Sequence, residues 1–338
     1  MLIPRQFSAA TEAGPQAGTA VHSLQGRTMG TAWSLRCVLP AGADPAAAMP
    51  LLQAAIQAAL DRVVAQMSHW DPASELSRFN AAPAGSWHRL SDDFYTVLDA
   101  AQRLAQQTDG AYDVTAGALV NAWGFGPLPA SRSPDDAELR AALQTVGWQR
   151  LQLDAANRSA RQPGGLLLDL SSIAKGFGVD RMAAVLDRAG VLHYMCEIGG
   201  ELRGQGCKPD GSPWWVELEA VPDARGPLQR WLLALDELSV ATSGDYQRFY
   251  QRCAHRDAHT LDPRSGRPLR PAPASVSVIH RDCMQADALA TALTVLGLQD
   301  GMAYAERHQI AALFQIRRRD DPSLVDQHPS SALLAMLD

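Results

Sequence analysis

The chain has 338 residues, of which 46% are hydrophobic and 20% are charged, and its formal net charge is −6. This composition is typical of a globular protein with a large buried core, folded as one large domain or as two intimately packed subdomains. The acidic balance argues against nucleic acid as the main partner, and no apolar run approaches the ~20 residues that span a bilayer.

The N-terminal residues 1–25 are rich in Ala, Gly, Thr and Gln, and we expect them to form a flexible arm. Their start lacks the continuous apolar core of a signal peptide and an early cysteine for a lipid anchor. The sequence as written therefore predicts a cytoplasmic protein, or a periplasmic, inner-membrane-associated one if an export segment has been removed. Five widely spaced cysteines without a C-x-x-C pair predict reduced thiols.

The first half of the chain after the arm is predicted to be mainly helical, because its apolar residues recur at helical spacing. In chain order the predicted elements are a strand over 31–39, a helix over 45–67, a capped turn from Ser74, and helices over 91–107 and 134–146. Between these last two helices, a polar turn, a short helix and an aromatic–glycine loop fall within residues 110–127.

The second half is predicted to be richer in strands, with a hairpin across Gly199-Gly200. Strands are expected at 151–153, 166–170, 194–198, 201–206, 214–218, 232–235, 238–241, 275–280 and 311–316, and a helix over 283–296 ends at Gly297. Helices on a largely antiparallel sheet predict an α+β fold of mixed sheets flanked by helices. We expect residues 26–316 to form a single domain and the charged tail, 317–338, to pack loosely.

A junction between a strand and a helix, residues 165–180, combines groups that suit a phosphate and a cation. The apolar run 166–170 has the length of a strand and carries Asp169, and the two serines that follow are good N-cap residues for a helix. A helix start offers free N–H groups to phosphate, while a carboxylate and hydroxyls suit a hard cation. An ordinary capped junction with Lys175 on the surface explains the same residues.

The helix predicted over 283–296 carries one charge, Asp287. Asp287 and Thr291 are four residues apart and share the face opposite the leucines. A lone carboxylate there costs stability unless it has a partner, which a hard metal bound by both side chains would supply. A solvated outer face explains the pair as well, although its neighbouring alanines are unusual on such a face.

Two later segments end in residues that let a ligand approach the backbone. Residues 239–246 predict a strand that ends in Thr-Ser-Gly, and residues 259–268 contain a tight Asp-Pro-x-x-Gly turn. His259 is a candidate general base because the free pKa of histidine lies near neutrality, although a structural hydrogen bond explains a lone histidine too. The sequence has no dinucleotide-binding glycine motif, Walker loop or serine-hydrolase elbow, which removes those classes.

Eight short segments follow one another in a fixed order. They are Met29-Gly-Thr31, residues 67–80 (MSHWDPASELSRFN), 112–117 (YDVTAG) running on to 123–127 (WGFGP), 169–176 (DLSSIAKG), 198–201 (IGGE), 241–246 (ATSGDY), 259–263 (HTLDP) and 286–291 (ADALAT). Each alone is a weak signal, but together they resemble the ApbE family, the FAD:protein FMN transferases, from about Arg27 to Gly297. The resemblance implies an ApbE-like, FAD-binding fold for residues 26–316.

The resemblance also implies an Mg²⁺-dependent enzyme that moves the FMN moiety of FAD onto a Ser or Thr hydroxyl of an acceptor protein and releases AMP. It places the metal at Ser172, Asp287 and Thr291, with a main-chain carbonyl near Ser172 as an alternative to its hydroxyl. It places FAD at Met29, Trp70, Ala116, Gly117, Ala118, Asp169, Lys175 and Leu261. Trp70 replaces the Tyr of many members but keeps a ring for stacking. Ala290 stands where some members have a second carboxylate, which implies fewer protein ligands for the metal here.

In the implied mechanism, Mg²⁺ on the pyrophosphate neutralises charge and activates the FMN-side phosphorus. The acceptor hydroxyl needs a base, for which His259 is the first candidate and Asp245 the second. Two other functions use the same residues: an Mg²⁺-dependent FAD pyrophosphatase that gives FMN and AMP, and a non-catalytic FAD-binding carrier. The Asp287/Thr291 pair and His259 argue against the carrier, since storage needs no activated phosphate.

Overall fold

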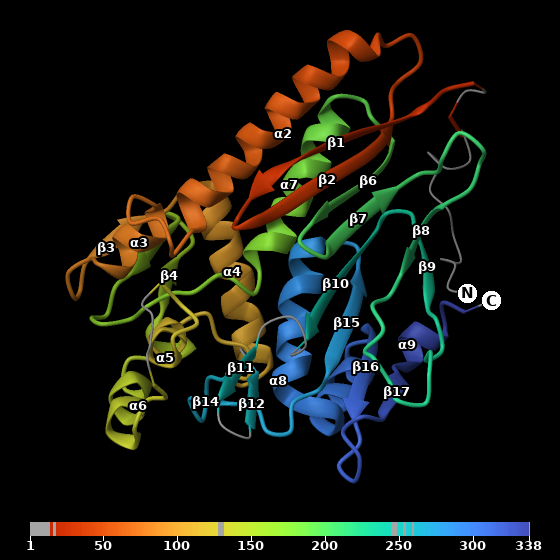
Figure 1. Cartoon of the computed structure of the whole chain (residues 1–338). Coiled ribbons are helices and arrows are strands. Elements are labelled where there is room, and N and C mark those ends of the chain that lie inside the picture. The colour runs from red at the N-terminus through yellow and green to blue at the C-terminus, as the bar shows by residue number, and fades with distance from the viewer. Residues whose placement is uncertain are drawn as a thin grey trace.

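One eight-stranded antiparallel sheet, in the order β1-β2-β6-β7-β10-β15-β16-β17, organises the chain (Figure 1). The computed structural model describes residues 14–15, 18–127, 132–244 and 260–337, and the backbone of 249–252 and 255–258. The strands of this sheet are β1 (Val21–Thr28), β2 (Thr31–Val38), β6 (His193–Ile198), β7 (Glu201–Gln205), β10 (Leu238–Gly244), β15 (Ser275–His280), β16 (Ala311–Arg317) and β17 (Val325–Pro329).

Three helices cover one face of this sheet: α2 (Pro45–Met67), α7 (Ala174–Arg188) and α8 (Cys283–Arg307). α7 contacts both α2 and α8, and Figure 1 shows the three helices over the same face. Strand residues two apart point to the same side, so alternate residues of β2 and β6 are buried against α2 and α7. The other face of the sheet is covered by the hairpin β8 (Trp214–Glu217)–β9 (Leu232–Leu235) and by α9 (Ser331–Leu334).

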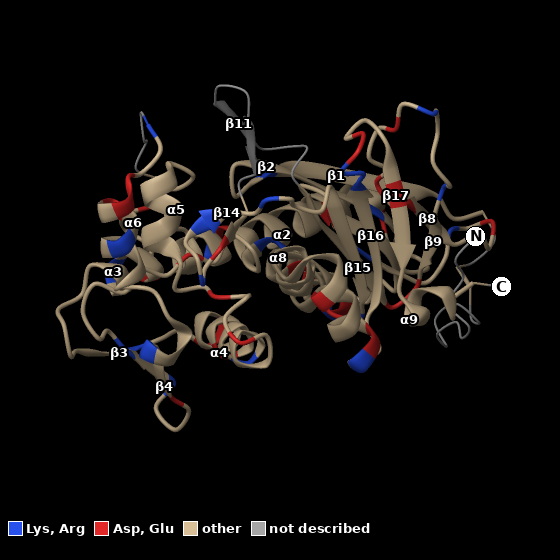
Figure 2. Ribbon diagram, turned by 90° about the horizontal axis from the view of Figure 1, so that it is seen from below, with Lys and Arg blue, Asp and Glu red and all other residues tan. Residues whose placement is uncertain are grey.

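A second part of the molecule lies beside the main sheet, with α4 (Asp92–Gln107) and α8 between them (Figure 2). It holds the three-stranded sheet β3 (Trp87–Arg89), β5 (Ser159–Arg161), β4 (Gln152–Asp154), helices α3 (Glu75–Asn80), α5 (Gly117–Trp123) and α6 (Asp136–Leu143), and the 3₁₀ helix η1 (Trp148–Arg150). Short strands complete the described chain: β11 (Phe249–Arg252), β12 (His255–Ala258), β13 (Leu261–Asp262) and β14 (Arg267–Pro268). One hydrophobic cluster contains α4, α8 and β15 residues together with the run 166–170, so the two parts share a core.

The predicted α+β architecture with largely antiparallel sheets is confirmed. The predicted helix over 45–67 has the same bounds in the structure, and the helix predicted over 91–107 is α4 with Ser91 at its N-cap. In the predicted hairpin, Ile198 pairs with Glu201 across the Gly199-Gly200 turn. Among the described helices, none combines the length and the apolar composition that a bilayer crossing requires.

The run 166–170 is not a strand, contrary to prediction. Its only ladder contact among described residues is a single bridge between Leu167 and Ala116. Instead, the Asn80 side chain bonds both backbone polar groups of Leu168, at 2.8 and 3.0 Å. An amide side chain can offer a donor and an acceptor as a neighbouring strand would, so the run is buried and extended without a sheet.

Ser171 and Ser172 do not cap the following helix, which also corrects the prediction. α7 begins at Ala174 with Ile173 in the N-cap position, and neither serine makes a capping hydrogen bond to it. Ser172 Oγ instead donates to the Tyr112 hydroxyl at 3.1 Å.

The predicted ends of the ordered chain are also wrong where they meet strands. Residues 21–25, expected in the arm, belong to β1, because they pair with β2 from Val21↔Val38 onward. The tail expected to pack loosely supplies β17 and α9, and β17 pairs along β16. The helix predicted to end at Gly297 does break there, at a φ of 75°, but a second helical segment continues to Arg307.

Candidate functional site

The contact between α7 and α8 places a carboxylate in a buried position. Asp287 lies in the second turn of α8 with 6% of its surface exposed, and its Oδ2 accepts a hydrogen bond from the Gly176 N–H at 2.9 Å. A Cβ at Gly176 would collide with the Cys283 carbonyl and lie 2.8 Å from the Asp287 Cβ. The glycine therefore allows the two helices to approach, and Asp287 Oδ1 has no hydrogen-bond partner among the described residues.

Two further ionisable side chains, Lys175 and Glu201, interact with this carboxylate. Lys175, at the start of α7, forms an ion pair with Glu201, the first residue of β7, whose side chain is 2% exposed. Burial raises the pKa of Asp287, and Lys175 opposes this rise. Burial and the Asp287 carboxylate raise the pKa of Glu201, and the Lys175 ammonium opposes this rise. Burial lowers the pKa of Lys175, but the Asp287 and Glu201 carboxylates raise it by more. The Lys175 ammonium therefore stays charged.

The start of α8 is fixed by a residue of α7. Asp180 accepts hydrogen bonds from the Cys283 N–H at 3.0 Å and the Met284 N–H at 2.9 Å. These are free N–H groups of a helix N-terminus, which a carboxylate stabilises. Arg203 of β7 pairs with the same carboxylate at 3.0 Å. These contacts fix the start of α8 against α7, and so they fix the position of Asp287 along α7.

Tyr112 connects this carboxylate to the strand-to-helix junction. Its ring is buried and its hydroxyl accepts from Ser172 Oγ. Burial is the main cause that raises the pKa of Tyr112, and the charges of Asp287 and Asp169 contribute to the rise. Ser172 therefore contacts the Tyr112 phenol, and the charges of Asp169 and Asp287 both act on it.

Asp169 in turn supports an exposed aromatic ring. Its Oδ1 lies 3.2 Å from His69 Nδ1 and accepts from the Ser171 N–H at 2.8 Å. Burial works against ionisation, but His69 and Ser171 hold the pKa of Asp169 below its usual value. The next residue after His69, Trp70, is 62% exposed, and its ring centroid lies 5.4 Å from that of His69. A flat apolar face is thus presented to solvent beside a buried anion.

Two further predicted FAD-binding segments meet at the start of α5. The Gly117 N–H donates to the Leu167 carbonyl at 3.0 Å, and a Cβ at Gly117 would lie 2.6 Å from that oxygen. Ala116 and Leu261 belong to one small hydrophobic cluster, while Ala118 is only partly buried. Residues 116–118 and Leu261 are therefore neighbours, although they are far apart in the sequence.

Met29 occupies the two-residue turn between β1 and β2. Its φ is 48°, in the left-handed region that few residues other than glycine adopt, and Gly30 follows with a φ of 74°. The Met29 Cε lies 2.9 Å from the position of a Cβ on Gly178 of α7. The hairpin tip therefore rests on α7 next to the Lys175–Asp287 group.

The remaining predicted residues differ in what can be said of them. Thr291 is partly buried and lies one turn after Asp287 on α8. His259 and Asp245 lie outside the described residues. Within the described part of the chain, no three His, Cys, Asp or Glu side chains form a metal-binding group. A cation at Asp287 would rely on hydroxyl, carbonyl or phosphate oxygens for its other ligands.

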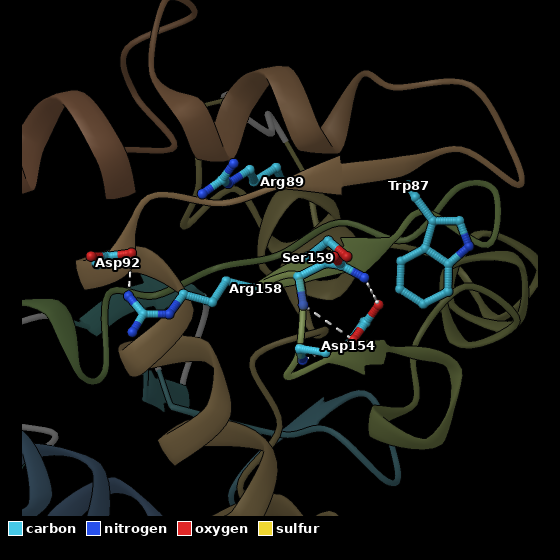
Figure 3. Close-up of a pocket in the computed structure, with 8 residues that line it drawn as sticks. Trp87, Arg89, Asp92, Asp154, Arg158 and Ser159 are labelled. Carbon is cyan, nitrogen blue, oxygen red and sulfur yellow. Dashed lines mark hydrogen bonds and ion pairs between the residues drawn. The ribbon is translucent and has the colours of Figure 1, made fainter.

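A separate cavity of about 720 Å³ lies on the three-stranded sheet, and none of the predicted site residues that the structure describes line it (Figure 3). Trp87 and Arg89 of β3 line it together with Asp92, Asp154 and Arg158. Arg158 pairs with Asp92, and Asp154 accepts from the side chain of Asn157 in its own turn. The polar groups of this hollow are largely engaged with one another.

Sequence reasoning missed Glu201, His69 and Tyr112, which hold the predicted residues in place. All three lie within segments that carried the family resemblance, at 198–201, 67–80 and 112–117. The available signal for Glu201 was a carboxylate directly after a Gly-Gly turn, on a strand that should be half buried. Its partner Lys175 is not adjacent in sequence, so the pairing itself had no local signal.

Comparisons with known proteins find relatives that match most of the chain. The model of the ApbE family matches residues 29–314. A curated FAD:protein FMN transferase of Vibrio cholerae is 40% identical over 301 residues, which is 89% of this chain and 88% of that protein. The solved apo form of the Pseudomonas stutzeri flavinyl transferase ApbE has a TM-score of 0.85 and 35% identity, over 94% of this chain and 97% of that one. The flavin transferase ApbE from Vibrio cholerae also has a TM-score of 0.85, with 38% identity over 94% and 100% of the chains.

Proposed function

This chain belongs to the ApbE family and is an FAD:protein FMN transferase, and from this premise we propose that it uses Mg²⁺ and transfers FMN to a Ser or Thr hydroxyl with release of AMP. The observation that carries the proposal is the buried Asp287 carboxylate at the α7–α8 contact. One of its oxygens is fixed by a backbone N–H and the other has no partner among the described residues.

The residues at this contact fit a hard divalent cation. A buried carboxylate with a free oxygen is costly alone, and Mg²⁺ binds such oxygens together with waters and substrate phosphates. Asp287 would hold the cation, with Thr291 and Ser172 or a nearby carbonyl. When bound, Mg²⁺ supplies charge neutralisation of the pyrophosphate and activation of the phosphorus.

The chain's own residues would bind and orient FAD around this position. The Lys175 ammonium offers a positive charge to the phosphates. The exposed Trp70 ring offers a stacking surface, which His69 and Asp169 hold in place. Met29, Leu261 and residues 116–118 would line the rest of the site.

Removal of the proton from the acceptor hydroxyl needs a base. We assign this role to His259, which precedes Leu261 by two positions, with Asp245 as the reserve. An acceptor protein is the second substrate. The cytoplasmic location expected from the sequence, and the extent of the domain, stay predictions.

The test is mass spectrometry of a Ser- or Thr-containing candidate acceptor peptide incubated with the enzyme, FAD and Mg²⁺. A mass gain of one FMN less water is expected. Asp287→Ala should lower the transfer rate by ~100-fold or more because it removes the charge that holds the cation. Asp300→Ala, which removes an exposed carboxylate from the same helix, is the matched control and should leave the rate unchanged.

His259→Ala should lower the rate by roughly 10²–10⁴-fold while FAD binding stays normal. A near wild-type rate in this variant would remove His259 from the role of base. If FMN and AMP form at the same rate with and without acceptor and the peptide gains no mass, the reaction is hydrolysis of FAD instead.

A further inference from the structure

Two ion pairs of opposite polarity join β7 to α7. Glu201 of β7 pairs with Lys175 of α7, and two residues further along the strand Arg203 pairs with Asp180, which lies more than a turn further along the helix. Strand residues two apart share a face, so both pairs lie on the side that faces the helices. The tight Gly199-Gly200 turn, with positive φ at both residues, places Glu201 at the very start of the strand.

The Lys175 ammonium can pair with either of two carboxylates, Glu201 and Asp287. It pairs with Glu201, and the next residue of α7, Gly176, donates its N–H to Asp287 Oδ2 at 2.9 Å, so the backbone of Lys175 lies beside the second carboxylate. A lysine side chain has a flexible four-carbon stem, so its ammonium can turn to whichever acceptor is available. If Glu201 did not hold it, Asp287 would be the remaining carboxylate within reach.

Stability alone does not account for the Lys175–Glu201 pair. The Glu201 side chain is 2% exposed and that of Lys175 is 32% exposed. Burying the Glu201 charge costs free energy that its attraction to Lys175 offsets, so such a pair is weak evidence for a stabilising role. Glu201 Oε2 has no hydrogen-bond partner among the described residues, which adds to that cost. The pair therefore calls for a role beyond stability.

We propose that Glu201 is a positioning residue, which holds the Lys175 ammonium away from Asp287 and so keeps the Asp287 carboxylate free to receive a divalent cation. The inference rests on the proposed function, because it requires a cation at Asp287. It explains why Asp287 Oδ1 is free of described partners although the residue next to Lys175 in the chain bonds the other oxygen of this carboxylate. It also leaves Lys175 fixed beside the cation, where the phosphates of FAD would meet it.

The test measures cation affinity without FAD, using Mn²⁺ as the probe and the electron paramagnetic resonance signal of free Mn²⁺ as the readout. Glu201→Gln is expected to weaken Mn²⁺ binding by ~10-fold or more, as loss of a residue that orients metal ligands does. In the Lys175→Met background, the same Glu201→Gln change should have little effect, because no ammonium remains to compete. Arg181→Gln breaks a different ion pair of α7, the one with Asp93, and is the matched control: it should leave Mn²⁺ affinity unchanged.

A crystal structure of Glu201→Gln without a cation gives a second readout that does not depend on charge alone. Lys175 Nζ is expected within hydrogen-bond distance of Asp287. An ammonium that stays on the substituted amide at position 201, or an unchanged Mn²⁺ affinity, would overturn the positioning role. Should Glu201→Gln not fold, Glu201→Asp, which draws the carboxylate back from Lys175, must weaken Mn²⁺ binding in its place.

Measurements on the wild-type protein distinguish a failure of the positioning role from a failure of the proposed cation site. If it binds Mn²⁺ with the same affinity as Glu201→Gln, the positioning role falls and the proposed cation site stands. If the wild-type protein binds no Mn²⁺ while Asp287 is intact, the proposed cation site falls and the positioning role falls with it.

Discussion

Asp169 links a protonation equilibrium to the stability of the site. Although burial opposes its ionisation, its pKa is lowered in the folded protein, mainly by His69, so its charge stabilises the fold above the unfolded-state value of 3.8. That contribution is lost as the pH falls below this value. We therefore expect the free energy of unfolding of the wild type to drop more steeply below about pH 4 than that of Asp169→Asn.

Urea denaturation followed by circular dichroism at pH 7 and pH 3 checks this expectation. At pH 7, Asp169→Asn should cost about 1–3 kcal/mol, because it weakens a hydrogen bond to a charged group. Equal losses of stability in both proteins on acidification would show that His69 does not act on Asp169.

At the same scale, the sequence predicted the side chains that would contact ligands better than those that hold them. Asp287, Ser172 and Asp169 could be named because carboxylates and hydroxyls at helix starts have a recognisable chemistry. The partners of these residues could not be named, because His69 and Glu201 reach Asp169 and Lys175 across 100 and 26 positions of the chain, and a single sequence records no such contact.

At the scale of elements, the approach of α7 to α8 depends on a glycine. Gly176→Ala should destabilise the protein by about 1–3 kcal/mol, because the new Cβ meets the Cys283 backbone, which cannot turn away. The same change should weaken Mn²⁺ binding, because it displaces the N–H that fixes Asp287. Thermal unfolding and Mn²⁺ titration measure the two effects.

Gly178→Ala, two residues further along α7, is the control. Its Cβ would meet the flexible ends of Ile198 and Met29, and alanine favours a helix by about 1 kcal/mol over glycine. A loss of stability as large as that of Gly176→Ala would show that close helix packing at Asp287 is not the cause.

The elements that the sequence predicted well are those whose signals are local. Helices α2 and α4 have apolar spacing and a start residue that together define their bounds. The run 166–170 has the composition of a strand, but the side chains of Asn80 and Gln162 bond part of its backbone, which no hydrophobic pattern reveals. The apolar composition of this run indicates that it is buried, but it does not indicate whether the run pairs with another strand.

For the whole molecule, the last strand closes one edge of the main sheet. Deleting residues 318–338 would expose the backbone of β16 and remove Leu333 from its hydrophobic cluster. We expect Tm to fall by roughly 10 °C or more and the truncated chain to aggregate, since an unpaired edge strand recruits other strands. Differential scanning fluorimetry and light scattering measure both effects, and Arg319→Ala, in the exposed turn before β17, is the control.

The sequence of residues 317–338 predicts a loosely packed tail, because its many polar residues obscure the pattern of a short strand. Only the sheet register shows that residues 325–329 complete an edge, so the extent of the fold could not be read from composition. An unchanged Tm in the truncated protein would mean that β17 adds little to the sheet.

The turn at Met29 has a consequence for attempts to engineer this protein. Glycine would adopt its left-handed conformation without the cost of about 1–2 kcal/mol that a side chain incurs there. A selection for heat resistance would therefore favour Met29→Gly, and would in the same step discard the side chain that touches α7 beside the cation position. Thermostable variants of this chain should be ranked by FAD retention before melting temperature, since a change at this turn that raises the melting temperature is expected to weaken FAD binding.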